Sequence, residues 1–191
     1  MDTIVSKPRF GTDGWRGIIG EDFNSFNCLL VVTSLLKLSP NLKKIIIGYD
    51  TRELSYEISI KIKKYLFNKG IDAILSSCPI PTPAVSFSVK NKGADLGIII
   101  TASHNSKIWN GIKIKNKYGQ SISESEASKL TEIIYKEKID MDEFNKFDLI
   151  DLKENNLTDL LPDYINSIKK IIDVNKIKNS KLNLIVDCMN G

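Results

Sequence analysis

Residues 95–106 read DLGIIITASHNS, an apolar run that is followed at once by a polar loop. A short apolar run bounded by turn-forming residues is typical of a buried strand. In open α/β sheets, ligands bind beyond the carboxyl ends of the strands, so the loop TASHNS lies where a site is expected. This loop also holds His104, the only histidine of the chain.

Helices and strands alternate on both sides of this stretch. The apolar patterns predict helices over 25–38, 54–68 and 123–138, a short helix with Pro83 at its first position, and strands over 44–49, 71–77 and 95–100. Thr82 is expected to cap one helix, and Ser123 with Glu126 to form a capping box. GIKIKN (111–116) predicts an exposed strand of alternating pattern. Apolar strands joined by crossover helices imply an α/β fold, with a mixed, mainly parallel sheet covered by helices on both faces.

The pattern changes after the fourth helix. Residues 139–156 are acidic and weakly periodic, which is typical of a domain linker or edge segment. A helical stripe of leucine and isoleucine follows, and LNLIVD (182–187) predicts one more buried strand. A parallel strand needs neighbours on both sides, and nothing follows Gly191 to supply them. We therefore expect one domain over 1–150 and the start of a second α/β domain over 151–191, as the front part of a longer protein.

Composition excludes several functional classes. With 191 residues, 42% apolar and 26% charged, the chain has an ordinary globular composition. The net charge of +4 comes from lysines without a basic block, which argues against a nucleic-acid partner. No run of apolar residues is long enough for a membrane span, and no signal peptide begins the chain, so we expect a cytoplasmic protein. Three widely spaced cysteines predict free, buried thiols: Cys28, Cys78 and Cys188.

The loop TASHNS permits several kinds of chemistry. A serine beside a histidine suggests a hydrolase, but immediate chain neighbours rarely reach the in-line geometry of a catalytic triad. The glycine-rich loops that bind mononucleotides and dinucleotides are absent from the sequence. A plain polar turn, in which Ser103 and Asn105 bond their own backbone, stays open at this point.

Five further stretches narrow the choice. They are RFGTDGWRG (9–17), GYDTR (48–52), CPIPTPAVSF (78–87), NGIK (110–113) and IVDCMNG (185–191). Together with TASHN, and in this order, they resemble the N-terminal portion of the α-D-phosphohexomutase family, in its phosphoglucomutase/phosphomannomutase branch. The resemblance runs from residue 9 to residue 191, nearly the whole chain.

The resemblance implies an intramolecular phosphotransferase. Ser103 would be the phosphoserine that interconverts hexose 1-phosphate and hexose 6-phosphate, of glucose or mannose, through a hexose 1,6-bisphosphate that is intermediate and activator. Arg16 and Lys113 would flank the phosphate, and Lys113 is the better candidate for proton transfer. His104 and Asn105 would orient the loop or contact phosphate and sugar. Arg52 is expected to bind phosphate or, alternatively, to pair with Asp50 or Glu53.

The resemblance also implies a bound Mg²⁺, which neutralises charge on the phosphoserine. Ser103, through its phosphate, is the only metal-linked residue expected here, because the family's aspartate-rich metal loop does not occur in this sequence. Asp140, Asp142 and Glu143 lack the glycines of that loop and predict a solvated acidic face. The chain alone would therefore need the C-terminal domains of the same protein for activity.

Some departures keep other functions open. Ser106 stands where the family usually has proline, so the loop lacks one source of rigidity. Trp15 stands where phosphoglucosamine mutases more typically have isoleucine, which separates that alternative only weakly. A non-catalytic phosphosugar-binding module is the third possibility. Trp15 and Trp109 are expected to be packing residues.

Overall fold

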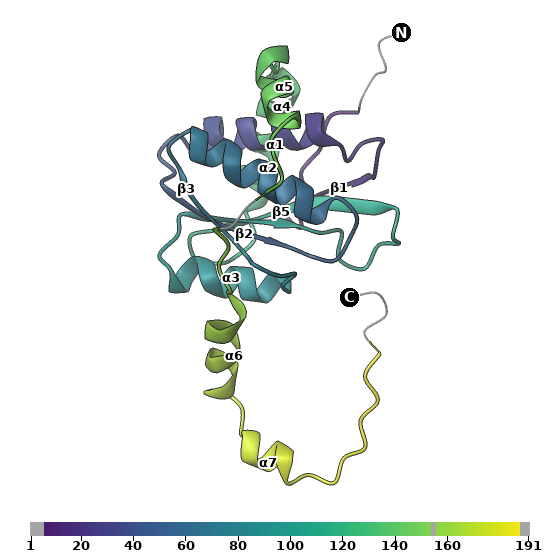
Figure 1. Ribbon diagram of the computed structural model, residues 1–191, viewed down its shortest axis with the longest axis vertical. Helices are drawn as coiled ribbons and strands as arrows, with labels where there is room; N and C mark the ends of the chain where they lie inside the picture. Colours follow the sequence, from purple (N-terminus) through teal and green to yellow (C-terminus); the bar gives the residue numbers. More distant parts are fainter. Residues whose placement is uncertain (1–5, 154–155, 188–191) are drawn as a thin grey trace.

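A five-stranded sheet organises the described part of the chain, residues 6–153 and 156–187 of this computed structural model (Figure 1). The strands are β1 (Trp15–Ile18), β2 (Lys44–Tyr49), β3 (Asp72–Leu75), β4 (Leu96–Ile100) and β5 (Trp109–Asn116). Their spatial order is β1-β5-β4-β2-β3. Strand β2 is parallel to β3 and β4, whereas β5 is antiparallel to both β4 and β1. The sheet is therefore mixed, and among the described strands only β5 opposes the common direction, as the predicted mainly parallel sheet requires.

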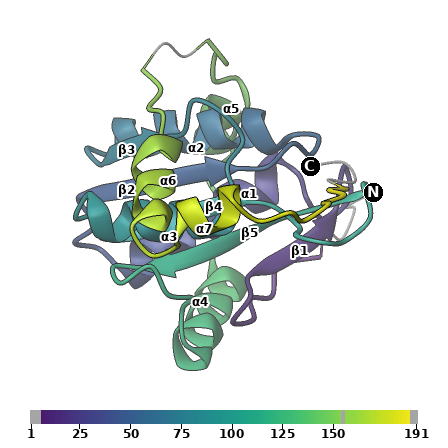
Figure 2. The same ribbon diagram turned by 90° about the horizontal axis from the view of Figure 1, so that it is seen from below.

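Helices cover both faces of the sheet (Figures 1 and 2). One face carries α1 (Ser25–Leu38) and α2 (Ser55–Asn68), with α4 (Glu124–Lys136) and α5 (Met141–Asp148) packed beyond them. The other face carries α3 (Thr82–Asn91), followed by α6 (Leu161–Lys169) and α7 (Val174–Lys178). This arrangement confirms the α/β prediction. No helix among the described residues is both long and apolar enough to cross a bilayer.

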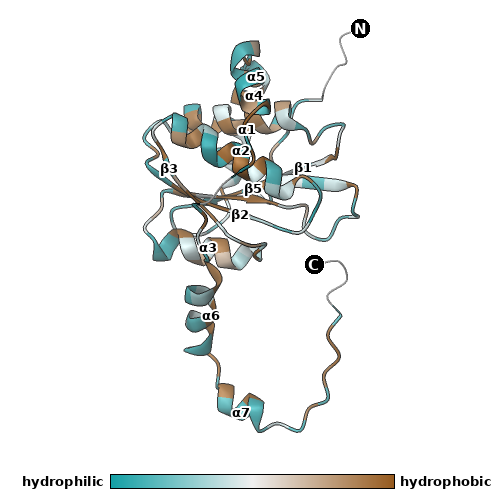
Figure 3. Ribbon diagram, in the orientation of Figure 1, coloured by the Kyte–Doolittle hydropathy of each residue, from teal (hydrophilic) through white to brown (hydrophobic). Residues whose placement is uncertain are grey.

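The apolar strands feed two separate cores. In β2, Ile45 and Ile47 pack toward α1 and α2, whereas Ile46 packs toward α3, and all three are fully buried. Alternate residues of a strand point to opposite faces, so a strand covered on both faces is apolar at every position. The hydropathy colouring shows mostly brown central strands between helices in which teal and brown residues alternate (Figure 3).

Strand β5 corrects one prediction. GIKIKN was expected to be exposed, but residues 111–114 are buried because β5 lies between β4 and β1. The covering strand β1 has only four residues, too few for its pattern to predict a strand. Helix α3 also begins one residue earlier than expected, with Pro81 in place of Thr82 at the N-cap. The capping box of Ser123 and Glu126 is confirmed.

Residues 139–156 correct a second prediction. Instead of a linker, residues 141–148 form helix α5, which Asp140 caps by accepting a hydrogen bond from the backbone N–H of Asp142. Phe147 is fully buried, edge to face with Tyr65 of α2. Glu143 accepts hydrogen bonds from Tyr65 and Lys69, so it is not merely part of a solvated acidic face. Sequence periodicity missed α5 because one buried aromatic residue anchors this short helix.

The C-terminal segment follows the expected pattern only in part. Leu160 is fully buried on the α3 side, and Tyr164 of α6 lies beside Phe87 of α3, with ring centroids 6.0 Å apart. The strand predicted over 182–187 is not formed, and Ile185 in that stretch is 99% exposed. No described strand pairs with it, and an unpaired strand lacks the hydrogen bonds that stabilise one.

The cysteines follow their prediction only in part. Cys28 is a buried free thiol, and burial raises its pKa far above the ordinary value. Cys78 is free but only partly buried. Cys188 lies outside the described residues.

Candidate active site

The loop TASHNS begins where two neighbouring strands end. Tyr49 of β2 pairs with Ile100 of β4, and the backbone N–H of Asp50 donates to the Ile100 carbonyl over 3.1 Å. Segments 50–54 and 101–106 therefore leave the sheet side by side. Strand β2 leads into α2 on one face, whereas β4 is entered from α3 on the other, which makes this edge a topological switch point. A cleft of about 1190 Å³ opens there, and its lining includes Arg52.

Ser103 has a strained backbone and an exposed side chain in this cleft. Its φ is 57°, and within the described ranges the only other non-glycine residue with positive φ is Leu54. Such conformations are costly for residues with a side chain and are concentrated at functional sites. The backbone N–H of Ser103 donates to the Thr101 hydroxyl over 2.9 Å, and within residues 6–153 and 156–187 the Ser103 hydroxyl itself has no hydrogen bond. Its hydroxyl therefore remains available to a ligand in the cleft.

Two cations meet near the loop through one carboxylate. Arg16 donates from Nη1 to the side-chain oxygen of Asn105 over 2.7 Å and from Nη2 to Asp13 over 2.6 Å. Lys113 donates from Nζ to the other oxygen of Asp13 over 2.8 Å. The structure thus joins three predicted site residues, Arg16, Asn105 and Lys113, into one network. Asp13 bridges them, and sequence analysis did not identify its carboxylate.

The Asp13 bridge is asymmetric in its exposure. The side chain of Lys113 is only 11% exposed, whereas that of Asp13 is 65% exposed. The hydrogen bond from Lys113 holds the pKa of the Asp13 carboxyl below its ordinary value, and the positive charges of Lys113 and Arg16 act in the same direction. Asp13 is therefore an anion that orients two cations while remaining accessible from solvent.

A tight turn places Asp13 against the sheet. Gly11 and Gly14 exchange backbone hydrogen bonds of 3.1 Å, and Gly14 has a φ of 98°. A Cβ atom added to Gly14 would lie 2.4 Å from the carbonyl oxygen of Ile112, so the turn rests directly on β5 beside Lys113. Asp-Gly pairs are common in tight turns, but only the tertiary structure shows which strand this turn contacts.

Arg52 lines the cleft, and its guanidinium bonds to residues of the protein. Its Nε lies 3.3 Å from Asp50, which is one of the two ion pairs considered for it. Its terminal nitrogens donate to carbonyl oxygens of the loop, those of Ser103, Asn105, Ser106 and Trp109. The guanidinium is therefore engaged by the protein itself in this conformation.

His104 and the two tryptophans take different positions. His104 is exposed and lines the cleft, and within the described ranges its imidazole has no hydrogen bond to Ser103 or to any other residue. A serine–histidine pair of the hydrolase type is thus not present in this conformation. Trp15 is 6% exposed and stacks on Phe23, as expected of a packing residue, while Trp109 is half-buried.

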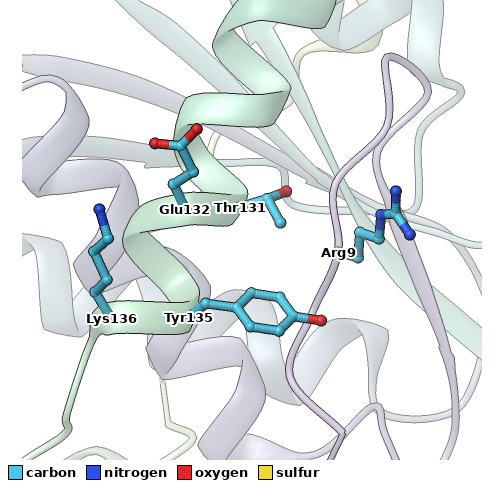
Figure 4. A pocket seen from close by; sticks show the side chains of 5 residues that line it. All are labelled: Arg9, Thr131, Glu132, Tyr135 and Lys136. Atoms are coloured by element: carbon cyan, nitrogen blue, oxygen red, sulfur yellow. The ribbon is translucent and has the colours of Figure 1, made fainter.

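Two other features were tested as sites. A smaller hollow of about 440 Å³ lies between the N-terminal segment and α4; Figure 4 shows Arg9 on one side and, on the helix, Thr131, Glu132, Tyr135 and Lys136. Arg9 does not line the cleft of Ser103. Among residues 6–153 and 156–187, no three histidine, cysteine or acidic side chains are grouped so that they could hold a metal ion. The hollow beside α4 is lined by none of the predicted site residues, so the cleft at the end of β4 is the candidate active site.

Comparison with known proteins agrees with this fold. Residues 7–140 match a protein-family model described as "Phosphoglucomutase/phosphomannomutase, alpha/beta/alpha domain I". The phosphoglucosamine mutase of Caldicellulosiruptor bescii is 33% identical over 185 residues, covering 95% of this chain and 40% of the relative. That of Sulfurovum is 34% identical over 185 residues, covering 95% and 41%.

A solved structure supports the fold alone. Parafusin, a phosphoglucomutase from Paramecium in its open form, superimposes with a TM-score of 0.75 at 20% identity, over 91% of this chain and 37% of that one. The chain thus spans about 40% of the length of the curated relatives that it matches. Since the family match covers most of the chain and the fold agrees with it, the chain belongs to the phosphoglucomutase/phosphomannomutase family.

Proposed function

We propose that this chain supplies the phosphoserine domain of a phosphohexomutase, which interconverts hexose 1-phosphate and hexose 6-phosphate. The observation that carries the proposal is Ser103, which is exposed and left-handed at the switch point of the sheet. Membership of the family supports the reaction class. The proposal extends to the longer protein, because the chain spans about 40% of its relatives.

The proposed reaction transfers one phosphoryl group in each direction. In the first step the bond between phosphorus and the Ser103 oxygen breaks, and a bond forms to the free hydroxyl of the hexose monophosphate. The sugar hydroxyl loses its proton, and the serine oxygen gains one. The hexose 1,6-bisphosphate then reorients in the site, and its other phosphoryl group is transferred to Ser103. Such transfers depend mainly on positioning and on neutralisation of charge.

The network around Asp13 supports the electrostatic part of this proposal. A phosphoserine carries close to two negative charges at neutral pH, so it needs cations that are already oriented. Asp13 holds Arg16 and Lys113 together, and Arg16 also bonds Asn105 of the loop. Lys113, which is largely buried, is the residue that we assign to proton transfer at the sugar hydroxyl. His104 and Asn105 are assigned to contacts with phosphate and sugar.

Magnesium has one proposed attachment point in this chain. Mg²⁺ prefers oxygen ligands, and a phosphoryl group on the exposed Ser103 would offer them. When bound, the ion supplies further neutralisation of charge on the phosphoryl oxygens. The described residues contain no cluster that could complete its coordination, so we assign the other ligands to the further domains of the protein.

The boundary of the domain is also a proposal. Helix α5 packs on α1 and α2, which supports a first domain that extends to about residue 150. Residues 151–191 would then begin the second domain.

Three hexoses are candidates for the sugar. Glucose and mannose phosphates follow from the family description. Glucosamine phosphate is favoured by the two curated relatives above, both of which are phosphoglucosamine mutases. An assay of the longest protein that the gene encodes, with each of the three hexose 1-phosphates, separates them by kcat/KM.

The test of the mechanism is phosphorylation at a single serine. The same full-length protein is incubated with Mg²⁺ and either glucose or glucosamine 1,6-bisphosphate, and peptides across 91–113 are analysed by mass spectrometry. We expect a phosphoryl group on Ser103 that is lost in Ser103→Ala and kept in Ser106→Ala, the neighbouring control. An unmodified Ser103 in the wild-type protein would instead favour a phosphosugar-binding module without catalytic function.

A further inference from the structure

The guanidinium of Arg52 binds the backbone of the Ser103 loop at four points. From Nη2 it donates to the carbonyl oxygens of Ser103 over 2.8 Å and Asn105 over 2.5 Å. From Nη1 it donates to those of Ser106 over 2.7 Å and Trp109 over 2.9 Å. Three of these carbonyls belong to the loop, and the fourth belongs to Trp109, the first residue of β5, so Arg52 links the loop to the start of that strand. One side chain thus spans the loop from residue 103 to residue 109.

The guanidinium of Arg52 is itself oriented by Asp50. Asp50 pairs with Nε of Arg52 and accepts a hydrogen bond from the backbone N–H of the same residue over 3.0 Å. The same Asp50 oxygen accepts from the Ser55 hydroxyl over 2.8 Å. Only 14% of the Arg52 side chain is exposed. Because a carboxylate pairs with this arginine and the side chain is largely buried, its planar guanidinium is held in one orientation.

A second contact ties the end of the loop to the same segment. Asn110 donates from Nδ2 to the Ser55 hydroxyl and to the Glu53 carbonyl, each over 2.9 Å, and both Ser55 and Asn110 are fully buried. Segment 50–55 is therefore bonded to residues 103–110 by the side chain of Arg52 from one side and that of Asn110 from the other. The two left-handed non-glycine residues of the described chain, Leu54 and Ser103, lie in these two joined segments. A strained conformation persists only where its surroundings over-determine it, and these contacts supply that constraint.

We propose that Arg52 is a positioning residue that holds Ser103 in its left-handed conformation by cross-linking the loop carbonyls, and that it does not bind the phosphate. The proposal rests on the proposed function, in which Ser103 accepts the phosphoryl group. The contact at position 106 is to the backbone carbonyl, so it adds rigidity to the loop without depending on the side chain of Ser106.

The test compares Arg52→Lys with Arg9→Lys in the longest protein that the gene encodes. Lysine keeps the charge but lacks the planar fork, so it cannot bond four carbonyls at once. Arg9 lies outside the cleft and is the matched control for an arginine-to-lysine change. The first readout is hydrogen exchange of peptides across 101–110, measured without phosphate or sugar. We expect faster exchange there in Arg52→Lys only, with unchanged exchange in the strands.

The second readout is kcat and KM of the proposed mutase reaction, in which Ser103 carries the phosphoryl group. Displacement of a reacting group by about 1 Å costs on the order of a hundredfold in rate, so we expect Arg52→Lys to lower kcat by about tenfold or more with little change in KM. Unchanged loop exchange together with a raised KM would overturn the proposal and make Arg52 a phosphate ligand.

A third variant and the loop readout keep the result interpretable. If Arg52→Lys does not fold, Asp50→Asn removes the ion pair behind the guanidinium while leaving Arg52 in place, and a smaller rise in loop exchange is expected. No rise in a folded Asp50→Asn protein would count against the proposal. Because loop exchange is measured without substrate, it reports on Arg52 even if wild-type Ser103 proves not to be phosphorylated, which separates failure of this inference from failure of the proposed function.

Discussion

Gly14 lies in the turn that carries Asp13 onto β5, and its φ of 98° is one that other residues rarely adopt. The turn is so close to the strand that no side chain fits between the two backbones, since an added Cβ would meet the Ile112 carbonyl at 2.4 Å. At the scale of the residue, the position of Asp13 between Arg16 and Lys113 therefore depends on the absence of a side chain next to it.

Replacement of this glycine should cost more than its backbone conformation alone. Gly20 also has positive φ, at 84°, but nothing lies within 4 Å of its added Cβ, so Gly20→Ala measures the conformational cost by itself. We expect about 1 kcal/mol of destabilisation for Gly20→Ala and at least about 2 kcal/mol for Gly14→Ala in urea unfolding. Equal losses for the two variants would show that the turn relaxes away from β5.

Helix α5 shows how a short element can be fixed by tertiary contacts. Its eight residues are too few to form a stable helix alone. Phe147 is buried among α1, α2 and α5 and lies 5.8 Å from the Tyr65 ring, measured between centroids. Ion pairs of Lys61 with Asp148 and of Lys69 with Glu143 flank this contact. The helix is therefore part of the first folded body rather than a connection between domains.

Truncation of Phe147 should expose this dependence. Phe147→Ala removes a fully buried ring, and we expect a loss of roughly 3–5 kcal/mol in the free energy of unfolding. Phe67→Ala on α2 is the matched control, because Phe67 is 74% exposed and should cost less than about 0.5 kcal/mol. Urea titrations followed by circular dichroism measure both free energies of unfolding. An effect of Phe147→Ala as small as that of Phe67→Ala would contradict the anchoring of α5 by Phe147.

Across the whole molecule, several carboxylates are held in ion pairs or hydrogen bonds that favour their charged form. The pKa is below the ordinary value for each of Asp13, Asp95, Glu126, Glu143 and Asp148. For Asp95 the main cause is hydrogen bonding from the backbone N–H groups of Lys43 and Lys44. These two bonds join the starts of β2 and β4. For Glu143 it is the hydrogen bond from Lys69.

These shifts set the direction of the pH dependence. A carboxyl whose pKa is lower in the folded state stabilises the fold above its unfolded pKa, and the contribution is lost as the pH falls through the folded pKa. The ordinary values are 3.8 for aspartate and 4.5 for glutamate, so the loss should begin near them and continue below. We expect the free energy of unfolding in urea to decrease from pH 5 to pH 3, and less steeply in Glu143→Gln. A constant free energy over this range would contradict the expectation.

The sequence by itself determined the kind of fold and the location of the site. Apolar periodicity placed α1 to α4 and β2 to β5 to within a few residues, because core positions repeat with the period of each element, but it missed β1 and α5. The polar loop after an apolar strand identified the cleft, because the carboxyl ends of strands are where α/β sheets bind ligands. These are local patterns, and they can be recognised without knowing what lies across the fold.

Only the tertiary structure decided the partners of the site residues. Asp13 and Lys113 are 100 positions apart, and Arg52 is 51 positions from the Ser103 carbonyl that it bonds. It likewise decided that β1 covers β5, that Phe147 anchors α5, and that the stretch 182–187 has no strand partner within the described chain. Contacts of this kind depend on how the strands are ordered and on what covers each edge, and no periodicity along the chain encodes either.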